Sequence, residues 1–280
     1  MQIVRTVEEL RAWSRAARLA GKTTGLVPTM GALHAGHASL LRAARAQCDR
    51  VAVSVFVNPT QFGPNEDYAR YPRTFDADCA LAAAEGVEAV FAPAVDELYP
   101  EGAATFVDVE GLSERLDGAS RPGHFRGVAT VVTKLLIAAE PDRAFFGQKD
   151  AAQVTVLRRM VRDLRLATEL VVCPIVREHD GLALSSRNMY LSPQERVEAL
   201  ALSRAINTVE DLVGHGQRNA ATLIEAAEAV LGGEPLIRVD YITVVNWHTL
   251  EPVESATPGT LFAIAAWVGA TRLIDNTIVA

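Results

Sequence analysis

The chain has 280 residues, enough for one large domain or two of moderate size, and its three cysteines fit neither a disulfide framework nor a CxxC zinc site. Its 27 basic residues against 34 acidic ones give a net charge of −7, which does not favour nucleic acid as the main partner. The N-terminus lacks the pattern of a secretory signal, and the most apolar runs are far shorter than the ~20 residues that a bilayer requires. We therefore expect a soluble, cytoplasmic protein that binds neither nucleic acid nor membrane.

Short apolar runs alternate with longer helical patterns through the first two thirds of the chain. After a charged, helix-like N-terminal segment, the predicted strands are residues 24–29, 51–57, 89–92, 143–146 and 170–176. The predicted helices between them are residues 37–48, 75–85, 127–139 and 150–164. This alternation predicts a doubly wound α/β domain with a parallel sheet and right-handed crossovers.

The pattern changes after Asn188. Ser192 and Pro193 are typical of a helix start, and the predicted helix continues to residue 213, where the sequence Gly-His-Gly indicates a turn. A second predicted helix covers residues 219–231, and the predicted strands are residues 236–245, 261–268 and 271–279. Helices followed by strands predict a small α+β domain, so we divide the chain into domains 1–180 and 181–280.

The first candidate site is the sequence TMGALHAGH, residues 29–37, between a predicted strand and a predicted helix. In an open α/β sheet, ligands bind beyond the carboxyl ends of the strands. Gly31 and Gly36 allow close approach of the backbone, and His34 and His37 are spaced to share one side of a helical turn, facing an anion at the helix start. The alternatives are a helix cap or surface histidines. A zinc site is disfavoured because no third ligand accompanies the pair.

The second predicted strand ends in FVNPTQF, where Asn58 and Gln61 offer neutral amides suited to a small hydroxy acid. The alternative interpretation is a proline-containing loop with solvated side chains. Residues 63–74 (GPNEDYARYPRT) are polar and rich in turn formers, which predicts a mobile flap.

The third and fourth sites again adjoin strand ends or the domain boundary. In FGQKD, Lys149 can meet a phosphate as a point charge and Gln153 follows one turn later, whereas Asp150 is interpreted as a helix N-cap. In DGLALSSRN, two serines and Arg187 can hold a triphosphate, although the segment alone also resembles a linker. In RPGHFRG, residues 121–127, the arginines add positive charge, and His124 is either part of the site or a helix cap.

Histidines, a lysine and arginines at neighbouring strand ends predict a basic pocket in an acidic chain. Such a pocket suits a nucleoside triphosphate, and it lacks both the P-loop and the GxGxxG signatures.

These motifs resemble a known family. TMGALHAGH resembles the HIGH motif of the nucleotidyltransferase superfamily that includes class I aminoacyl-tRNA synthetases, with Ala35 in place of isoleucine. Its ordered combination with FVNPTQF, RPGHFRGV, FGQKD and DGLALSSRNMYLS resembles the pantoate–β-alanine ligase family from about residue 25 to residue 191. Ser-Ser-Arg stands where the tRNA synthetases carry the lysine-rich KMSKS loop, which disfavours a synthetase.

The resemblance implies a Rossmann-like nucleotide- and pantoate-binding domain, closed over its ATP site by the C-terminal domain. It implies condensation of pantoate with β-alanine through a pantoyl adenylate formed from ATP with Mg²⁺, releasing pyrophosphate and AMP. It also implies a homodimer. The runner-up activity is an adenylyltransferase that leaves the nucleotide on its product, and a non-catalytic nucleotide-binding module is a third class.

The resemblance also assigns roles to residues. The implied ATP contacts are Pro28, Thr29, Met30, Gly31, Ala32, Leu33, His34, Ala35, Gly36, His37, Gly147, Gln148, Lys149, Asp150, Val176, Leu184, Ser185, Ser186 and Arg187. The resemblance also implies that Gln61 and Gln153 contact pantoate, with Gln61 near β-alanine as well, and Met30 and Asn58 complete the predicted substrate contacts. The predicted catalytic residues are His34, His37, Lys149 and Arg187.

The family takes the second histidine, His37, as the catalytic acid. A carboxylate nucleophile brings no proton to remove, however, so we interpret the catalytic residues mainly as stabilisers of transition-state charge. No protein ligand for Mg²⁺ is assigned: Asp76 and Asp78 are candidates, but solvated helix carboxylates are the preferred interpretation.

Overall fold

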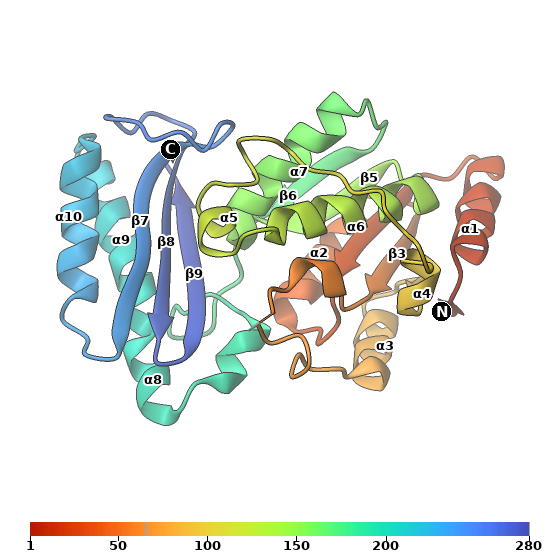
Figure 1. Cartoon of the computed structure of the whole chain (residues 1–280), viewed down its shortest axis with the longest axis horizontal. Helices are drawn as coiled ribbons and strands as arrows, with labels where there is room; N and C mark the ends of the chain where they lie inside the picture. Colours follow the sequence, from red (N-terminus) through yellow and green to blue (C-terminus); the bar gives the residue numbers. More distant parts are fainter. Residues whose placement is uncertain (65, 280) are drawn as a thin grey trace.

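The computed structural model describes residues 1–64 and 66–279, and these form one parallel and one antiparallel sheet with their helices (Figure 1). The strands are β1 (Gln2–Val4), β2 (Thr24–Thr29), β3 (Arg50–Val55), β4 (Ala89–Phe91), β5 (Arg143–Gly147), β6 (Glu169–Cys173), β7 (Ile237–Asn246), β8 (Thr260–Val268) and β9 (Thr271–Ile278). The α-helices are α1 (Val7–Leu19), α2 (Ala35–Gln47), α3 (Phe75–Ala84), α4 (Val95–Leu98), α5 (Asp117–Ser120), α6 (His124–Ala139), α7 (Ala151–Asp163), α8 (Pro193–Glu198), α9 (Leu200–Gly214) and α10 (Ala220–Leu231). Short 3₁₀ turns are η1 (Pro59–Gln61), η2 (Gln148–Asp150) and η3 (Ser186–Tyr190).

The larger sheet has the strand order β1-β4-β3-β2-β5-β6, and every neighbouring pair is parallel. From β2 the chain moves outward through β3 and β4, then returns to place β5 on the other side of β2. The order therefore reverses between β2 and β5, which is the position where open α/β sheets bind ligands. The predicted doubly wound α/β fold is confirmed.

Alternating side chains of the central strands pack against two helical layers. Leu26 packs in a cluster with residues of α1, α6 and α7, whereas its neighbour Val27 packs in a cluster with residues of α2 and α3. A strand covered on both faces needs apolar residues at every position, which explains the continuous apolar run that predicts β2.

The C-terminal domain is an antiparallel sheet of order β7-β8-β9, with α9 and α10 on its outer side (Figure 1). On β8, Phe262 and Ile264 pack with α9 and α10, whereas Leu261 and Ala263 join the core cluster of the larger domain. This sheet is therefore held between its own helices and the first domain. The predicted small α+β domain is confirmed, and the boundary at residue 180 stays a prediction.

Several predicted element ends shift in the structure. Strand β6 ends at Cys173 because Pro174 has no N–H group to continue the ladder. The single helix predicted from residue 193 is two helices, since the amide of Leu202 bonds the carbonyl of Ala199 in a tighter turn. Strand β1 and the short helices α4 and α5 are additional elements, and α6 begins at His124, three residues before its predicted start.

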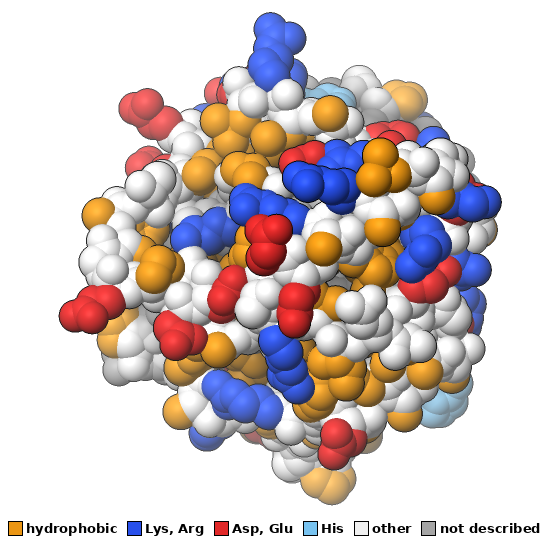
Figure 2. Space-filling model, turned by 90° about the vertical axis from the view of Figure 1, so that its right-hand side faces the viewer, with side chains coloured by type: hydrophobic (Ala, Val, Ile, Leu, Met, Phe, Trp, Pro, Cys, Tyr) orange, Lys and Arg blue, Asp and Glu red, His pale blue; other side chains and the backbone are white. Residues whose placement is uncertain are grey.

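Acidic and basic side chains are interspersed on the face at the end of the molecule that carries α1 and α3 (Figure 2). Exposed ion pairs on such a face contribute little to stability. Among the described residues, no helix is long and apolar enough to cross a bilayer.

Candidate active site

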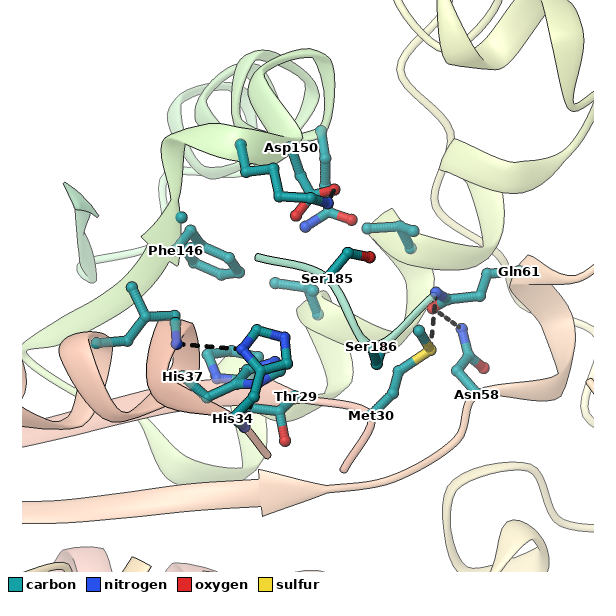
Figure 3. Close-up of a pocket in the computed structure, with 18 of the residues that line it drawn as sticks. Thr29, Met30, His34, His37, Asn58, Gln61, Phe146, Asp150, Ser185 and Ser186 are labelled. Carbon is teal, nitrogen blue, oxygen red and sulfur yellow. Dashed lines mark hydrogen bonds and ion pairs between the residues drawn. The ribbon is translucent and has the colours of Figure 1, made fainter. Parts of the chain in front are cut away.

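The candidate site is a cavity at the carboxyl ends of β2, β3 and β5, beside the segment that leads into the C-terminal domain (Figure 3). Most of the candidate residues line it: Pro28, Thr29, Met30, His34, Gly36, His37, Asn58, Gln61, Gly147, Lys149, Asp150, Gln153, Val176, Leu184, Ser185, Ser186 and Arg187. Gly31, Ala32, Leu33, Ala35 and Gln148 are not among the lining residues. The four motifs, which are separated in the sequence, thus meet at the point where the strand order reverses.

The loop between β2 and α2 is held by a carboxylate that the sequence places on a solvated helix surface. Asp78 of α3 is buried, and its two oxygens accept hydrogen bonds from the amides of Ala32 (3.0 Å) and Leu33 (2.8 Å). Gly31 has φ of +83°, and a Cβ there would lie 2.9 Å from Asp78 Oδ2, so this position requires glycine. The interpretation of Asp78 as a solvated carboxylate is wrong, because α3 packs its first turn against this loop.

We expect Asp78→Ala to lower the free energy of unfolding by about 1–3 kcal/mol and to raise the KM for ATP roughly 10-fold, since two amides lose their acceptor and the histidine loop is misplaced. Thermal unfolding and steady-state kinetics measure both. Asp76→Ala is the matched control, because Asp76 is an exposed carboxylate in the same helical turn. An Asp78→Ala enzyme with the ATP KM of the control would refute this role for Asp78.

The two histidines of the loop are packed together at the start of α2, with ring centroids 4.2 Å apart (Figure 3). The amide of Gly36 donates to His34 Nδ1 (3.1 Å) and the amide of His34 donates to His37 Nδ1 (3.2 Å). These bonds place the ring protons on the Nε2 atoms, as donors. They also use two of the backbone amides that the sequence offers to an anion, which leaves the two Nε2–H groups as donors that a ligand in the cavity can use.

Both imidazoles are neutral at pH 7. Burial, followed by the neighbouring His34, lowers the pKa of His37 to about 3. Burial, followed by Lys149, also lowers the pKa of His34. The pair therefore offers two neutral N–H donors rather than two positive charges.

The cations of the site come from two different segments. Lys149 lies in η2, with Nζ 3.6 Å from Asp150 Oδ1. Arg187 lies in η3, and its Nε and Nη2 donate to the two oxygens of Asp67 at 3.2 and 3.1 Å. Burial alone would lower the pKa of Arg187, but Asp67 raises it above its ordinary value.

Asp150 does not act as the predicted N-cap. It occupies the position before α7, but its side chain makes no capping hydrogen bond. Its backbone follows the 3₁₀ turn η2, with ψ of 54° instead of the extended value typical of an N-cap, so its carboxylate is directed to Lys149 and the cavity.

The amides after β3 form a connected cluster with Met30 (Figure 3). Asn58 is buried, and its Nδ2 donates to Gln61 Oε1 (3.0 Å) and to the carbonyl of Gly127 (3.1 Å). The Oδ1 atom of Asn58 accepts from Tyr99 (2.8 Å), so both ends of this amide are used within the protein. Gln61 Nε2 donates to Met30 Sδ at 3.2 Å, which leaves a second N–H and a second oxygen lone pair for a ligand.

His124 supports Gln61 instead of capping a helix. It is the first residue of α6, after the N-cap Gly123, and its Nδ1 donates to the carbonyl of Gln61 (2.8 Å). Its Nε2 accepts from Arg121 (3.0 Å), and burial together with Arg121 lowers the pKa of His124 to about 4. The capping interpretation of His124 is wrong, because the ring is turned from the helix end toward η1.

The lining includes several residues that are absent from the sequence-based site, and two sets of them bear on the argument. One is an apolar wall on α6 formed by Val128, Val131, Val132 and Leu135, whose helical spacing is indistinguishable from that of core residues. The other is Tyr71, in the segment predicted as a flap, whose hydroxyl lies 3.3 Å from Ser186 Oγ. Asp67 and Tyr71 thus pack the described part of that segment against η3 and Arg187.

A profile of known families matches this chain over almost its whole length. The family described as pantoate-beta-alanine ligase matches residues 2–278. The chain belongs to the pantoate–β-alanine ligase family. It is therefore a ligase, and the resemblance carried by the five motifs is confirmed.

The sequences of individual family members are similar to this chain over nearly its whole length. A pantothenate synthetase of Koribacter versatilis is 58% identical over 278 residues, covering 99% of this chain and 96% of that protein. One of Moorella thermoacetica is 56% identical, covering 99% of this chain and 98% of that protein.

Solved structures of the family share the fold. The crystal structure of pantothenate synthetase from Thermus thermophilus is 48% identical, with a TM-score of 0.94, and the match covers 100% of this chain and 99% of that one. A pantoate–β-alanine ligase from Francisella tularensis, complexed with β,γ-ATP and β-alanine, is 32% identical with a TM-score of 0.82, covering 99% of this chain and 97% of that one.

Proposed function

We propose that this ligase joins pantoate to β-alanine in two steps through a pantoyl adenylate. The observation that supports it most is the convergence, in one cavity, of proposed phosphate ligands from the start of α2, from η2 and from η3 with the carboxamides of Gln61 and Gln153. The complex of the Francisella tularensis relative with β,γ-ATP and β-alanine supports the same choice of substrates.

In the first step, a carboxylate oxygen of pantoate attacks the α-phosphorus of ATP. The bond from that phosphorus to the bridging oxygen breaks, and its electron pair leaves with pyrophosphate. No proton has to move, so the protein's task is to position the groups and to stabilise the charge that accumulates on the phosphate oxygens. The Nε2–H donors of His34 and His37 and the cations Lys149 and Arg187 supply that stabilisation.

In the structure, Arg187 forms an ion pair with Asp67. We propose that the triphosphate takes over hydrogen bonds that Asp67 makes in the structure, because phosphate presents more acceptor oxygens to the planar guanidinium. Ser185 and Ser186 line the same side of the cavity as further donors.

Pantoate would lie between Gln61, Gln153 and the apolar wall of α6. The wall suits the two methyl groups on its third carbon, and the carboxamides suit its hydroxyls and carboxylate. Asn58 has both ends of its amide engaged by the protein, so we propose that it holds Gln61 in place rather than contacting substrate.

We expect Gln153→Ala to raise the apparent KM for pantoate about 10-fold, since it removes one hydrogen bond to a charged or polar substrate group. The KM for ATP serves as the internal control and should stay within a factor of about two of wild type. Initial rates of pyrophosphate release at varied pantoate concentration measure the effect. An unchanged KM for pantoate would remove Gln153 from the pantoate site.

In the second step, the amine of β-alanine attacks the acyl carbon, the bond to the AMP oxygen breaks, and the electron pair leaves with AMP. The attacking nitrogen releases a proton to solvent as the amide forms. Gln61 lines the same cavity and is proposed to contact β-alanine as well as pantoate. A cavity walled by α6 and η3 also limits hydrolysis of the adenylate.

The donor set of the site fits Mg²⁺ that arrives bound to ATP. Within the described part of the chain, no cluster of three His, Cys, Asp or Glu side chains is arranged to hold a metal ion by itself. Magnesium bound to nucleotides commonly uses one or two carboxylates together with phosphates and water, and Asp150 offers one carboxylate beside Lys149. When bound, the ion would neutralise charge on the phosphates.

One assay tests the proposed reaction. Protein, Mg-ATP and pantoate are incubated with and without β-alanine, and pyrophosphate and AMP are followed. We expect a burst of pyrophosphate without β-alanine and sustained release of AMP only when β-alanine is present. AMP release that ignores β-alanine would contradict the ligase reaction. Nucleotide retained on a stable product would favour the adenylyltransferase.

The cytoplasmic location, expected from the composition, and the homodimer, implied by the resemblance, both stay predictions. Sedimentation velocity of the purified chain measures its oligomeric state directly.

A further inference from the structure

The last strand of the C-terminal domain contacts the lysine turn of the first domain. Asn276, on β9, is only 3% exposed although it is polar. It lies against η2, the turn that carries Lys149, from a position 127 residues further along the chain. A buried carboxamide is costly unless its hydrogen bonds are made, so its partners indicate what it does.

All the contacts of this carboxamide are made to the lysine turn. Its Nδ2 atom donates to the backbone carbonyl of Gln148 (3.1 Å) and to that of Lys149 (2.9 Å). Its Oδ1 atom accepts from Nε2 of Gln148 (3.2 Å). The carbonyls of Gln148 and Lys149 belong to the peptide units on either side of the Lys149 Cα. One carboxamide that holds both carbonyls therefore fixes the direction in which the Lys149 side chain projects.

The strand that carries Asn276 is itself fixed to the first domain. The neighbouring Asp275 is 1% exposed, and its carboxylate accepts two hydrogen bonds from Arg177 (2.7 and 3.0 Å). The same carboxylate also accepts a hydrogen bond from the backbone amide of Asn276 (2.8 Å). Arg177 follows β6 in the segment that leads to η3, so β9 is anchored both at the lysine turn and in the segment between Lys149 and Arg187.

We propose that Asn276 is a positioning residue for Lys149, through which the C-terminal domain sets the geometry of the adenylation step. The proposal deepens the proposed function, since it rests on Lys149 meeting the phosphates of ATP. Neither Gln148 nor Asn276 lines the cavity, so Asn276 acts through the lysine turn and not on the substrates.

The isosteric variant Asn276→Asp separates hydrogen bonding from packing. Aspartate has nearly the same shape, but it replaces the Nδ2 donor by an oxygen that faces two carbonyl oxygens. We expect pyrophosphate release to slow roughly 100-fold in Asn276→Asp and roughly 10-fold in Asn276→Ala, which are the losses typical of a displaced reacting group. A role in packing alone predicts the reverse order of the two variants.

The matched control is Thr277→Ala. Thr277 is the next residue on β9, but its hydroxyl bonds Glu210 of α9 on the other side of the sheet, at 2.6 Å. This variant should release pyrophosphate at the wild-type rate. Thermal unfolding of all variants checks that each is folded at the assay temperature.

Two readouts separate positioning of Lys149 from a general loss of structure. The first is the second half-reaction, with synthetic pantoyl adenylate and β-alanine, which needs no pyrophosphate to depart and should proceed at the wild-type rate in Asn276→Asp. The second is a double-mutant cycle with Lys149→Ala, in which Asn276→Asp should add no further loss, because both changes remove the same interaction.

The same double-mutant cycle can be measured on ATP affinity, because Mg-ATP is not turned over when pantoate is absent. Calorimetry gives the affinity of each variant. Asn276→Asp should weaken ATP binding in the wild-type background and leave it unchanged in the Lys149→Ala background. The proposal would be overturned if the losses of the two single variants multiplied in the double variant, in either the rate cycle or the binding cycle. It would also be overturned if Asn276→Asp bound ATP as tightly as the wild type. If the wild-type protein binds ATP but releases no pyrophosphate in the presence of pantoate, the proposed function is contradicted. The double-mutant cycle on ATP affinity would still decide the role of Asn276.

Discussion

Replacing His37 by alanine is expected to slow pyrophosphate release by roughly 10²–10³-fold, the loss typical of one preorganised donor to a developing oxyanion. His37 is half-buried at the start of α2, and its Nδ1 accepts a hydrogen bond from the amide of His34. Its Nε2–H is therefore fixed in direction before substrate arrives. Such a donor costs no reorganisation during the reaction, which is why we expect the loss mainly in kcat.

The variant His37→Gln distinguishes charge stabilisation from proton transfer. Glutamine can place an amide N–H near the position of Nε2, but it cannot deliver a proton. If His37 only donates a hydrogen bond, His37→Gln should recover roughly 10-fold of the activity lost in His37→Ala, the worth of one hydrogen bond to a charged group. Equal activities of the two variants would contradict the hydrogen-bond role.

The pH dependence gives an independent test of the same point. Because burial and His34 lower the pKa of His37 to about 3, the imidazole of the free enzyme does not titrate between pH 6 and pH 8. The ratio of kcat/KM for ATP between wild type and His37→Gln should therefore be constant over this interval. An acid catalyst that titrates there would instead make the ratio rise as the pH falls, since only the wild type gains the protonated form.

The sequence predicts the interior of the parallel sheet better than its edge. Strands β2 and β3 are covered on both faces and appear as continuous apolar runs. Strand β1 has three residues, of which Gln2 and Ile3 are exposed, so no apolar run marks it. The early end of β6 depends on the hydrogen-bond ladder at Pro174, which hydrophobic periodicity does not report.

The grouping of the site motifs is also predictable, because motifs that follow parallel strands must meet at one edge of the sheet. The hydrogen-bond partners of the individual site residues are not predictable from the sequence. Asp78 has the sequence context of an acidic first turn, which is normally solvated, and only the packing of α3 on the histidine loop buries it. Asn276 and Lys149 are linked by no local pattern, since their contact depends on how two domains dock.

Replacing Lys149 by alanine is the second change for which we expect a loss of roughly 10²-fold or more in pyrophosphate release. The Lys149 side chain is 21% exposed, and its ammonium group lies 3.6 Å from Asp150 Oδ1, too far for a close ion pair. It is therefore available as a point charge where negative charge moves onto the leaving pyrophosphate. Lys149→Met, which keeps the length of the side chain and removes the charge, should be as slow as Lys149→Ala if charge is what matters.

The loss should be confined to the first step. In the proposed reaction, the charge that Lys149 would stabilise is gone once pyrophosphate has left, and the amine of β-alanine then attacks the acyl carbon, for which we propose Gln61 as a contact. Given synthetic pantoyl adenylate and β-alanine, Lys149→Met should therefore form product at the wild-type rate, while its release of pyrophosphate from ATP and pantoate is strongly reduced. Equal losses in both half-reactions would show that Lys149 shapes the whole cavity, and its role as a ligand of the leaving group would have to be abandoned.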